Sequence, residues 1–270
     1  MLFGMDLTPF DENNLKLYMG GIKMEKVKIF DVDILAGSRE ELFSATAELV
    51  GVGGAISTVN PEILYTSLEN EDLKKALVTS VCIPDGIGVA RTIRHKGVFS
   101  ECFPGVELGE ALLSVFSVRL GIIGGEEGVA ERAMKNLSEK YTSVTPAFSI
   151  CGYNINNDEI IDKIRTTKPD IVFVCLGSPK QEIFINEITH MFNDVLFVAL
   201  GGSVDIYSGD KRRAPRFVRR LHAEWLYRMI SEPIRVKRLP KLFLYTLKSR
   251  QKHAFGKKVG KIFKKGKKSI

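Results

Sequence analysis

The chain has 270 residues, a hydrophobic fraction of 44% and a formal net charge of +7. This is the composition of a globular protein with a sizeable core, and no apolar run reaches the roughly 18 residues that a membrane-spanning helix needs. The first residues include acids and lack a basic start, so we expect no signal peptide. The four cysteines lack metal-like spacing, which indicates reduced thiols in the cytoplasm.

Charge is distributed unevenly along the chain. Residues 211–270 hold 21 lysines and arginines against 2 acids, a balance of +19, whereas residues 1–210 hold 18 against 30, a balance of −12. We therefore expect an N-terminal extension over residues 1–25, an α/β domain over residues 26–210, and a basic helical appendage over residues 211–270. Such an appendage favours an anionic partner, which is a lipid surface, a nucleic acid or a phosphorylated substrate.

In chain order, short apolar runs alternate with amphipathic segments. The runs predict strands over residues 27–35, 51–60, 80–83, 119–123, 147–150, 169–176 and 195–200. The other segments predict helices over residues 38–49, 62–77, 111–118, 130–141, 158–166 and 180–192. A further helix follows Asp85 and Gly86 and ends at about residue 95. A capping box, Ser38 with Glu41, marks the start of the first helix. The alternation predicts a doubly wound, mostly parallel sheet.

Two of these strands end in polar residues beside glycine or proline. Thr58 and Asn60 lie at a strand-to-helix turn, where they could bind a ligand or cap the following helix. Asp85 and Gly86 follow the next strand. A carboxylate at a strand end, with a glycine that lets a ligand approach the backbone, is a candidate general base, although the pair could also form a simple Asp-Gly turn.

Three later strands end in the same way. Gly124 and Gly125 form a glycine turn of the kind that holds phosphates or sugars, but the spacing is not that of a dinucleotide fingerprint. Lys180 and Gln181 open a helix after the strand that ends near residue 176, and Asp205 follows the last strand. Carboxyl ends of parallel strands share one edge of a sheet, so we expect these residues and Asp85 to face one site.

An early Asp-x-Asp pair, Asp31 and Asp33, could hold a metal ion, but acids alternating along a strand more often mark a solvated face. The sequence contains no HExxH, Walker A or GxSxG motif and no Cys/His metal spacing. We interpret the four histidines as structural or solvated.

Residues 201–238 combine an apolar stripe with dense arginine. The stripe, Val218, Leu221, Trp225 and Met229, predicts one helix from Ala214-Pro215 to Pro233. The basic residues are Arg216, Arg219, Arg220, Arg228, Arg235, Lys237 and Arg238. The helix is either packed on the core with a solvated basic face, or its guanidinium groups bind phosphate.

This stretch resembles the C-terminal signature of the WecG/TagA/CpsF glycosyltransferase family. The matching residues are Gly201, Gly202, Ser203, Asp205, Arg213-Ala214-Pro215, Glu224-Trp225-Leu226-Tyr227-Arg228, Glu232-Pro233 and Arg235. Earlier matches are Thr58-x-Asn60, Pro84-Asp85-Gly86, Gly124-Gly125 and Gly177-x-Pro179-Lys180-Gln181-Glu182, so the resemblance covers about Val27 to Arg238.

The resemblance implies a Rossmann-like domain that moves an N-acetylmannosamine-like hexose from a UDP-sugar to an undecaprenyl-diphosphate-linked sugar, with inversion and with no metal or cofactor. It implies a protein bound peripherally to the inner face of the plasma membrane, with no nucleic-acid partner, and it leaves a homo-oligomer open. It also implies the following roles: Asp85 as base, Thr58 and Gln181 on substrate, Tyr153 near the uracil, Asp205 on the nucleotide, and Arg228, Arg235 and Arg238 on the diphosphate.

The chain departs from the family pattern at Cys102, where an arginine is usual, and mildly at Val204, where phenylalanine is commoner. The phosphate-binding role of that arginine is then missing, or is taken by one of Arg91, Arg94 and Lys96.

Two other classes compete with this interpretation. A Rossmann-type oxidoreductase would need a glycine fingerprint after the first strand, and none is present. A non-catalytic binding module would use the basic tail to grip nucleic acid or membrane. From Leu239 onward the tail lacks acids and alternates apolar clusters with lysines, which favours a helix lying on an anionic membrane over a solvated tail.

Overall fold

A single eight-stranded sheet organises the chain. The computed structural model describes residues 24–153, 156–221, 224–231 and 239–249. The strand order is β1-β2-β4-β3-β8-β7-β5-β6; β1 is antiparallel to β2 and every other neighbouring pair is parallel. The strands are β1 Glu25–Ile29, β2 Val32–Ala36, β3 Gly54–Val59, β4 Val81–Pro84, β5 Val118–Gly124, β6 Val144–Ile150, β7 Ile171–Cys175 and β8 Leu196–Ala199. The predicted mostly parallel, Rossmann-like sheet is confirmed.

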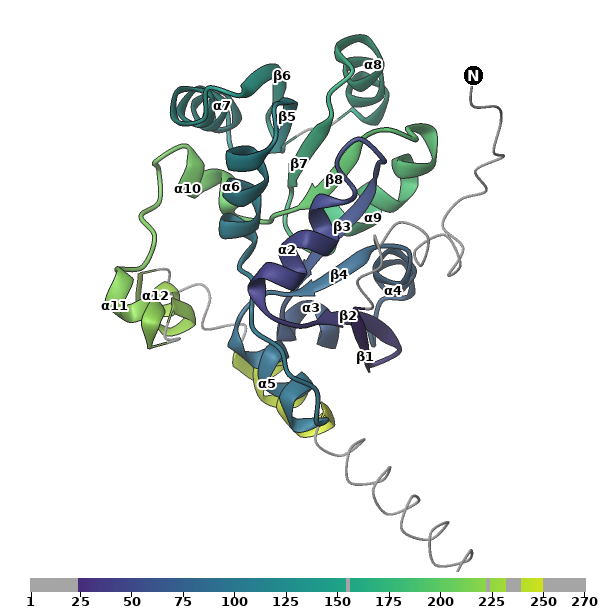
Figure 1. Cartoon of the computed structure of the whole chain (residues 1–270), viewed down its shortest axis with the longest axis vertical. Helices are drawn as coiled ribbons and strands as arrows, with labels where there is room; N and C mark the ends of the chain where they lie inside the picture. The colour runs from purple at the N-terminus through teal and green to yellow at the C-terminus, as the bar shows by residue number, and fades with distance from the viewer. Residues whose placement is uncertain (1–23, 154–155, 222–223, 232–238, 250–270) are drawn as a thin grey trace, which may run out of the picture.

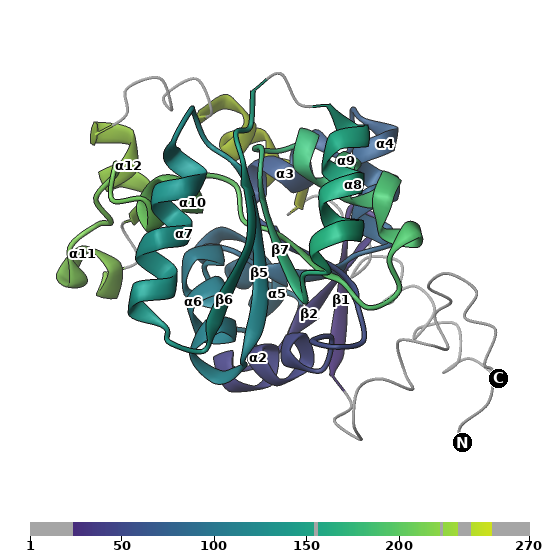
Figure 2. The ribbon, with the colours of Figure 1, turned by 90° about the horizontal axis from the view of Figure 1, so that it is seen from above.

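Helices connect the strands and cover both faces of the sheet (Figures 1 and 2). They are α2 Arg39–Ala47, α3 Pro61–Thr66, α4 Glu71–Val78, α5 Ile87–His95, α6 Gly105–Val115, α7 Val129–Lys140, α8 Asn157–Thr167, α9 Lys180–Ile188, a 3₁₀ turn Thr189–Met191, α10 Ser203–Tyr207, α11 Arg216–Arg220 and α12 Glu224–Ser231. A further helical segment, residues 239–249, is called the C-terminal helix here. In the part of the chain described, no helix is long and apolar enough to cross a bilayer.

Alternate residues of the central strands enter opposite halves of the core. In β7, Phe173 packs with α2, α6 and α7, while Val172 and Val174 pack with α8 and α9. Figure 2 shows the sheet nearly edge-on, with α6 and α7 on one side and α8 and α9 on the other. Because both faces are covered, these strands are apolar throughout, which explains why they were readily predicted.

The first predicted strand, residues 27–35, is wrong in one respect: it is the hairpin of β1 and β2. Phe30 and Asp31 form the turn with φ values of 52° and 69°, and the mixture of apolar and charged residues continues across it, so the reversal was not apparent from the sequence. Asp31 lies 3.5 Å from Lys74, and Asp33 also lies on the surface. These carboxylates are solvated, as the favoured interpretation of the Asp-x-Asp pair expected.

The helix predicted over residues 62–77 is two helices, α3 and α4. Asn70 begins α4, since its side-chain oxygen accepts a hydrogen bond from the Leu73 amide at 2.9 Å. A cap of this kind satisfies an amide at the helix start that has no partner within the helix, and so favours a new helix at this point. The prediction missed the break because apolar residues continue across it.

Helix α6 begins at Gly105, well before the predicted start at residue 111. Two glycines in its first turns concealed it, because glycine disfavours helix. The structure gives a reason for the second one: a Cβ on Gly109 would lie 2.4 Å from the Tyr207 hydroxyl. Close packing between α6 and α10 therefore outweighs the poor helix propensity.

The single helix predicted from Ala214 to Pro233 is also wrong. The structure has two short helices, α11 and α12, with α11 ending at Arg220. The apolar stripe is not packed on the core, since Leu221 is 74% exposed and Trp225 is 50% exposed. The core-packed interpretation of this stretch therefore fails.

The C-terminal helix returns to the body of the protein and lies beside α5 (Figure 1). Tyr245 is buried, its ring meets Phe30 edge-on at 5.6 Å, and its hydroxyl donates to Thr92 Oγ1 at 3.0 Å. Burial raises the pKa of Tyr245 to about 12. Lys241 Nζ also donates to Thr66 Oγ1 at 3.1 Å. Residues at the far end of the sequence thus pack against the first hairpin and α3.

Candidate functional site

A cleft of about 2610 Å³ opens at the carboxyl edge of the parallel strands. It is lined by residues that follow β3, β4, β5, β7 and β8, together with residues of α5, α11, α12 and the C-terminal helix. The strands β3 and β8, which are far apart in sequence, lie side by side beneath it. This is the point where the winding of the sheet reverses, and open α/β sheets bind their ligands there.

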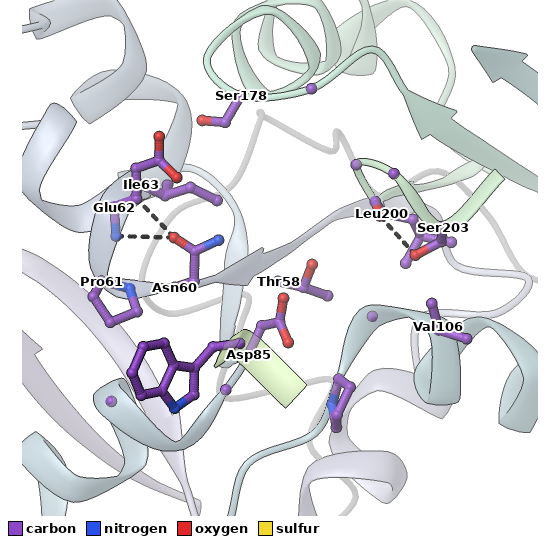
Figure 3. A pocket seen from close by; sticks show the side chains of 18 of the residues that line it. Thr58, Asn60, Pro61, Glu62, Ile63, Asp85, Val106, Ser178, Leu200 and Ser203 are labelled. Carbon is purple, nitrogen blue, oxygen red and sulfur yellow. Dashed lines mark hydrogen bonds between the residues drawn. The ribbon is translucent and has the colours of Figure 1, made fainter. Parts of the chain in front are cut away.

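Thr58 and Asn60 stand on the floor of the cleft at the end of β3 (Figure 3). The Thr58 hydroxyl donates to the Ala199 carbonyl at 2.9 Å, which ties β3 to β8 and leaves the oxygen able to accept a further hydrogen bond. Asn60 Oδ1 accepts from the amides of Glu62 and Ile63 at 2.9 and 3.0 Å. Its carbonyl therefore caps α3, as one interpretation expected, while its amide nitrogen lies on the cleft side in Figure 3.

Asp85 follows β4, and its carboxylate points into the cleft close to Thr58 (Figure 3). Its backbone is fixed, because the Asp85 amide donates to the Val59 carbonyl at 2.8 Å and the Phe103 amide donates to the Pro84 carbonyl at 2.8 Å. Gly86, with φ of 81°, then turns the chain into α5. A rigid backbone that aims one carboxylate into a cleft suits a general base.

The glycine turn after β5 lies against the end of β7. A Cβ on Gly124 would lie 2.4 Å from the Cys175 carbonyl oxygen, and one on Gly125 would lie 2.6 Å from Val129. Gly125 lines the cleft, whereas Gly124 lies behind it. Tyr153 is at the rim and is 65% exposed, so its ring is accessible to a ligand.

Lys180 and Gln181 begin α9 at the cleft wall. Lys180 is exposed, but Gln181 is buried and already holds two partners. Its oxygen accepts from the Gly201 amide at 2.9 Å, and its nitrogen donates to Glu182 Oε1 at 2.9 Å. Burial raises the pKa of Glu182, against the effect of its hydrogen bonds from Gln181 and Ser178. Gln181 thus joins the loop after β8 to α9.

Asp205 lies in the first turn of α10 and lines the cleft. Its carboxylate is 2.5 Å from Lys211 Nζ, and the Lys211 amide donates to the Asp205 carbonyl at 2.8 Å. The pair closes the loop that leads from α10 towards α11. A ligand that uses the Asp205 carboxylate must share it with this lysine.

Basic residues of α5 and α2 surround Cys102. Arg91, Arg94, Lys96 and Arg39 all line the cleft with it. Burial raises the pKa of the Cys102 thiol and the Asp85 carboxylate raises it further, while the guanidinium groups of Arg39 and Arg94 act in the opposite direction. Positive charge is therefore available at this wall although position 102 itself carries none.

The appendage forms a further part of the wall. Arg216, Arg219, Arg220, Trp225 and Met229 line the cleft from α11 and α12, and Leu242 and Phe243 line it from the C-terminal helix. Arg228 belongs to α12, but its side chain lies outside the described part of the structure. Arg235 and Arg238 lie outside the described residues.

Glu107 is a cleft residue that the motifs did not indicate. It lies in the first turn of α6, where its carboxylate meets the guanidinium groups of Arg39, Arg213 and Arg219. No local pattern marks such a cluster, because the partners lie 68, 106 and 112 positions away in sequence.

Most of the predicted site residues share the cleft. These are Thr58, Asn60, Asp85, Gly86, Gly125, Tyr153, Lys180, Gln181 and Asp205. In the described residues, no group of three or more His, Cys, Asp or Glu side chains is arranged as a metal site. The roles assigned to the individual residues stay predictions.

The fold and the cleft define an α/β protein with a cleft at the carboxyl edge of a parallel sheet, lined on the C-terminal side by basic helices. The chain belongs to the glycosyl transferase WecG/TagA/CpsF family, whose model matches residues 27–258. The resemblance drawn from the motifs is thus confirmed.

Curated relatives agree with this assignment. The chain is 35% identical over 205 residues to the N-acetylglucosaminyldiphosphoundecaprenol N-acetyl-beta-D-mannosaminyltransferase of Bacillus subtilis strain 168, covering 73% of this chain and 80% of the relative. It is 30% identical over 198 residues to the protein of the same description in Staphylococcus aureus strain MW2, covering 72% and 78% respectively.

Proposed function

We propose that this protein transfers an N-acetylmannosamine-like hexose from a UDP-sugar to a sugar carried on undecaprenyl diphosphate, in the synthesis of a cell-wall or surface polymer. The relatives that this chain covers over about four fifths of their length are named as N-acetyl-beta-D-mannosaminyltransferases acting on N-acetylglucosaminyldiphosphoundecaprenol. The observation that carries the proposal is that Asp85 and Thr58 share a cleft with basic side chains from α2, α5 and the appendage. That arrangement suits one acid–base step between two diphosphate-bearing substrates.

In the proposed step the Asp85 carboxylate takes the proton of the acceptor hydroxyl. The oxygen of that hydroxyl forms a bond to the anomeric carbon of the donor, and the bond from that carbon to the diphosphate breaks with its electron pair leaving on UDP. Displacement from the opposite side inverts the configuration. Thr58, held by its bond to Ala199, accepts a hydrogen bond from a sugar hydroxyl beside the base.

Charge that develops on UDP is stabilised by fixed cations in this proposal. Arg216 and Arg220 line the cleft, Arg228 lies on the same appendage, and Arg235 and Arg238 follow it in sequence. Guanidinium groups form paired hydrogen bonds with phosphate oxygens and need no metal ion to do so. We therefore expect the reaction to be independent of divalent metal.

In this proposal the nucleotide half of the donor lies beside the segments that follow β5, β6 and β8. Gly125 lines the cleft there, and Tyr153 offers an exposed ring at the rim for the uracil. The Asp205 carboxylate accepts hydrogen bonds from the ribose hydroxyls in this proposal while it keeps its ion pair with Lys211. Arg94 and Arg39 supply positive charge beside Cys102, in place of the arginine that the family pattern has there.

The acceptor approaches from a membrane surface in this proposal. Leu221, directly after α11, and Trp225 and Ile230 on α12 expose apolar side chains close in sequence to the arginines of α11. Exposed apolar groups flanked by cations suit the interface of an anionic bilayer. Peripheral association would bring the cleft to the lipid-linked substrate.

The test is transfer of radiolabelled hexose from UDP-N-acetylmannosamine, with and without undecaprenyl-diphosphate-linked N-acetylglucosamine, in the presence and absence of EDTA. We expect product only with the acceptor, and equal rates with and without the chelator. Binding of UDP without transfer would instead indicate a non-catalytic nucleotide-binding module. Loss of transfer in EDTA that magnesium or manganese restores would overturn metal independence.

A further inference from the structure

We propose that Glu107 is a positioning residue that holds the first two appendage helices, α11 and α12, over the cleft. Its effect on turnover rests on the proposed function, whereas its effect on the position of the helices does not. One carboxylate accepts hydrogen bonds from three guanidinium groups: Arg39 of α2, Arg213 at 2.5 Å and Arg219 at 3.3 Å. The last two belong to the appendage.

The carboxylate stands on a rigid support. Its neighbours in sequence, Val106 and Leu108, are buried in the core, and the Val106 carbonyl accepts a 2.9 Å hydrogen bond from the buried Tyr207 hydroxyl. Glu107 also lies in the first turn of α6, where the helix dipole favours a negative charge. A movement of Glu107 would therefore require a movement of the core itself.

Arg213 and Arg219 hold the start and the body of α11. Arg213 is the more enclosed of the two, with a side chain that is 16% exposed, and its Nε lies 3.8 Å from Glu224 Oε1 on α12. Arg219 Nε donates to the Ala214 carbonyl at 3.1 Å. One carboxylate on α6 is thus connected to both helices through two arginines.

Apolar packing contributes little to this attachment. Helix α11 contains no buried residue, and Phe217 is 67% exposed. On α12, Ile230 is 74% exposed. Because these helices bury so little apolar surface, polar contacts must supply most of their attachment.

Removal of the negative charge of Glu107 would replace attraction between the carboxylate and its three guanidinium partners by repulsion among those guanidinium groups. Three guanidinium groups now share one carboxylate, and a neutral side chain there would leave like charges close together in a part-buried setting. We therefore expect the Glu107→Gln variant to release α11 and α12 while the sheet remains folded. A released α12 would withdraw Trp225 and Met229 from the cleft wall.

Trp225 provides a direct readout, because it is the only tryptophan in the chain. In Glu107→Gln we expect its emission to shift to longer wavelength and its quenching by acrylamide to increase. We also expect faster trypsin cleavage within α11 and α12. In the transfer assay, kcat/KM should fall on the order of 10²-fold, since a displacement of about 1 Å in substrate-positioning groups can cost that much.

Glu110→Gln is the matched control. Glu110 lies on the same helix and pairs with Lys140 at 2.9 Å, away from the appendage. It should leave emission, quenching, proteolysis and transfer unchanged. Arg213→Gln removes the other side of the ion pair and should change Trp225 fluorescence as Glu107→Gln does. The variant that carries both substitutions should show a fluorescence change little larger than that of either single variant.

The outcomes separate the two proposals. If Glu107→Gln alters Trp225 fluorescence but the wild-type protein transfers no sugar, the role of Glu107 is retained and the proposed function is rejected. Wild-type fluorescence, proteolysis and transfer in a folded Glu107→Gln protein would overturn the role of Glu107 and leave the proposed function standing. Circular dichroism of each variant establishes that the sheet is intact.

Discussion

At the scale of single residues, two aspartates that face the same cleft differ in their surroundings. The Asp205 carboxylate is 2.5 Å from Lys211 Nζ, so it is already engaged in an ion pair. Asp85 stands at the end of β4, with backbone hydrogen bonds on both sides that fix its direction. Among the cleft residues of the described chain, Asp85 is therefore the one we propose as the base.

Asp85→Asn should reduce sugar transfer by about 10²–10⁴-fold, the usual contribution of a general base. The amide preserves shape but cannot accept the proton, so UDP binding and thermal stability should change little. The control is Asp33→Asn, which alters a surface carboxylate on β2. Transfer near the wild-type rate in Asp85→Asn would place the base elsewhere.

Glu182 gives a prediction about pH. Burial raises its pKa in the folded protein, so the folded state keeps the proton at pH values where the unfolded state has lost it. The stability that this group contributes is fully present below its unfolded-state pKa, and it is lost as the pH rises through the raised folded-state pKa.

Glu182→Gln should therefore lessen the fall in the free energy of unfolding as the pH rises from the ordinary carboxyl range towards neutral. The side-chain oxygen of glutamine can still accept the hydrogen bond from Gln181. Urea denaturation of both proteins at a series of pH values measures the difference between them. Parallel stability curves would show that Glu182 titrates normally in the folded protein.

At the scale of elements, the C-terminal helix is part of the packed structure as well as a wall of the cleft. Tyr245 is 2% exposed and joins the cluster that includes Phe30, Leu64 and Val89. The basic composition of this region predicted a membrane-lying tail. The composition does not distinguish one apolar residue that faces the core from others, such as Phe243, that stay exposed.

Tyr245→Ala should lower the free energy of unfolding by about 3–5 kcal/mol, as truncation of a buried aromatic ring usually does. Tyr245→Phe removes only the hydrogen bond to Thr92 and should cost about 1 kcal/mol. Chemical denaturation followed by circular dichroism measures both. Equal, small effects would mean that the C-terminal helix is not packed against α5.

Elements that are buried on both faces could be predicted from sequence, because their residues are apolar throughout. The errors fall where tertiary contacts or caps decide the backbone: the turn at Phe30 and Asp31, the new start at Asn70, and the glycine-containing start of α6. Each depends on a local hydrogen bond or close contact that apolar periodicity does not encode.

At the scale of the whole molecule, some residues of the candidate site could be predicted from the sequence and others could not. Residues at strand ends, such as Asp85 and Asp205, could be placed together because parallel strands share an edge. Glu107 could not be placed beside Arg39 and Arg213 from the sequence, because their proximity depends on how α6 packs against a distant part of the chain. The tail from Leu239 onward was expected to take part in the site as well as to bind the membrane, and residues of the C-terminal helix do line the cleft.

Two truncations test how the appendage serves membrane binding. Ending the chain after Ser249 removes nine lysines and arginines and no acids but keeps the C-terminal helix. We expect this protein to stay folded and to bind anionic vesicles more weakly, since each basic residue near such a surface contributes about 1 kcal/mol. Ending it after Lys237 should also destabilise the fold, because Tyr245 is lost.

Sedimentation with phosphatidylglycerol vesicles at low and high salt measures the binding, and circular dichroism measures the folding. Vesicles of neutral lipid are the control. Undiminished sedimentation of the chain that ends after Ser249 would show that its final residues do not anchor it, and the exposed apolar side chains of α11 and α12 would then carry the association.

The cleft is lined by residues as far apart in the chain as Arg39 and Ser249. A polypeptide emerges from the ribosome from its N-terminus, and domains generally fold as units in that order. The sheet and Asp85 can thus be in place before the last wall has been synthesised. A chain that stalls, ends early or loses its final helix to a protease would hold the proposed base in an incomplete cleft. We therefore expect partial products to transfer no sugar, so that activity appears only when the whole cleft has been synthesised.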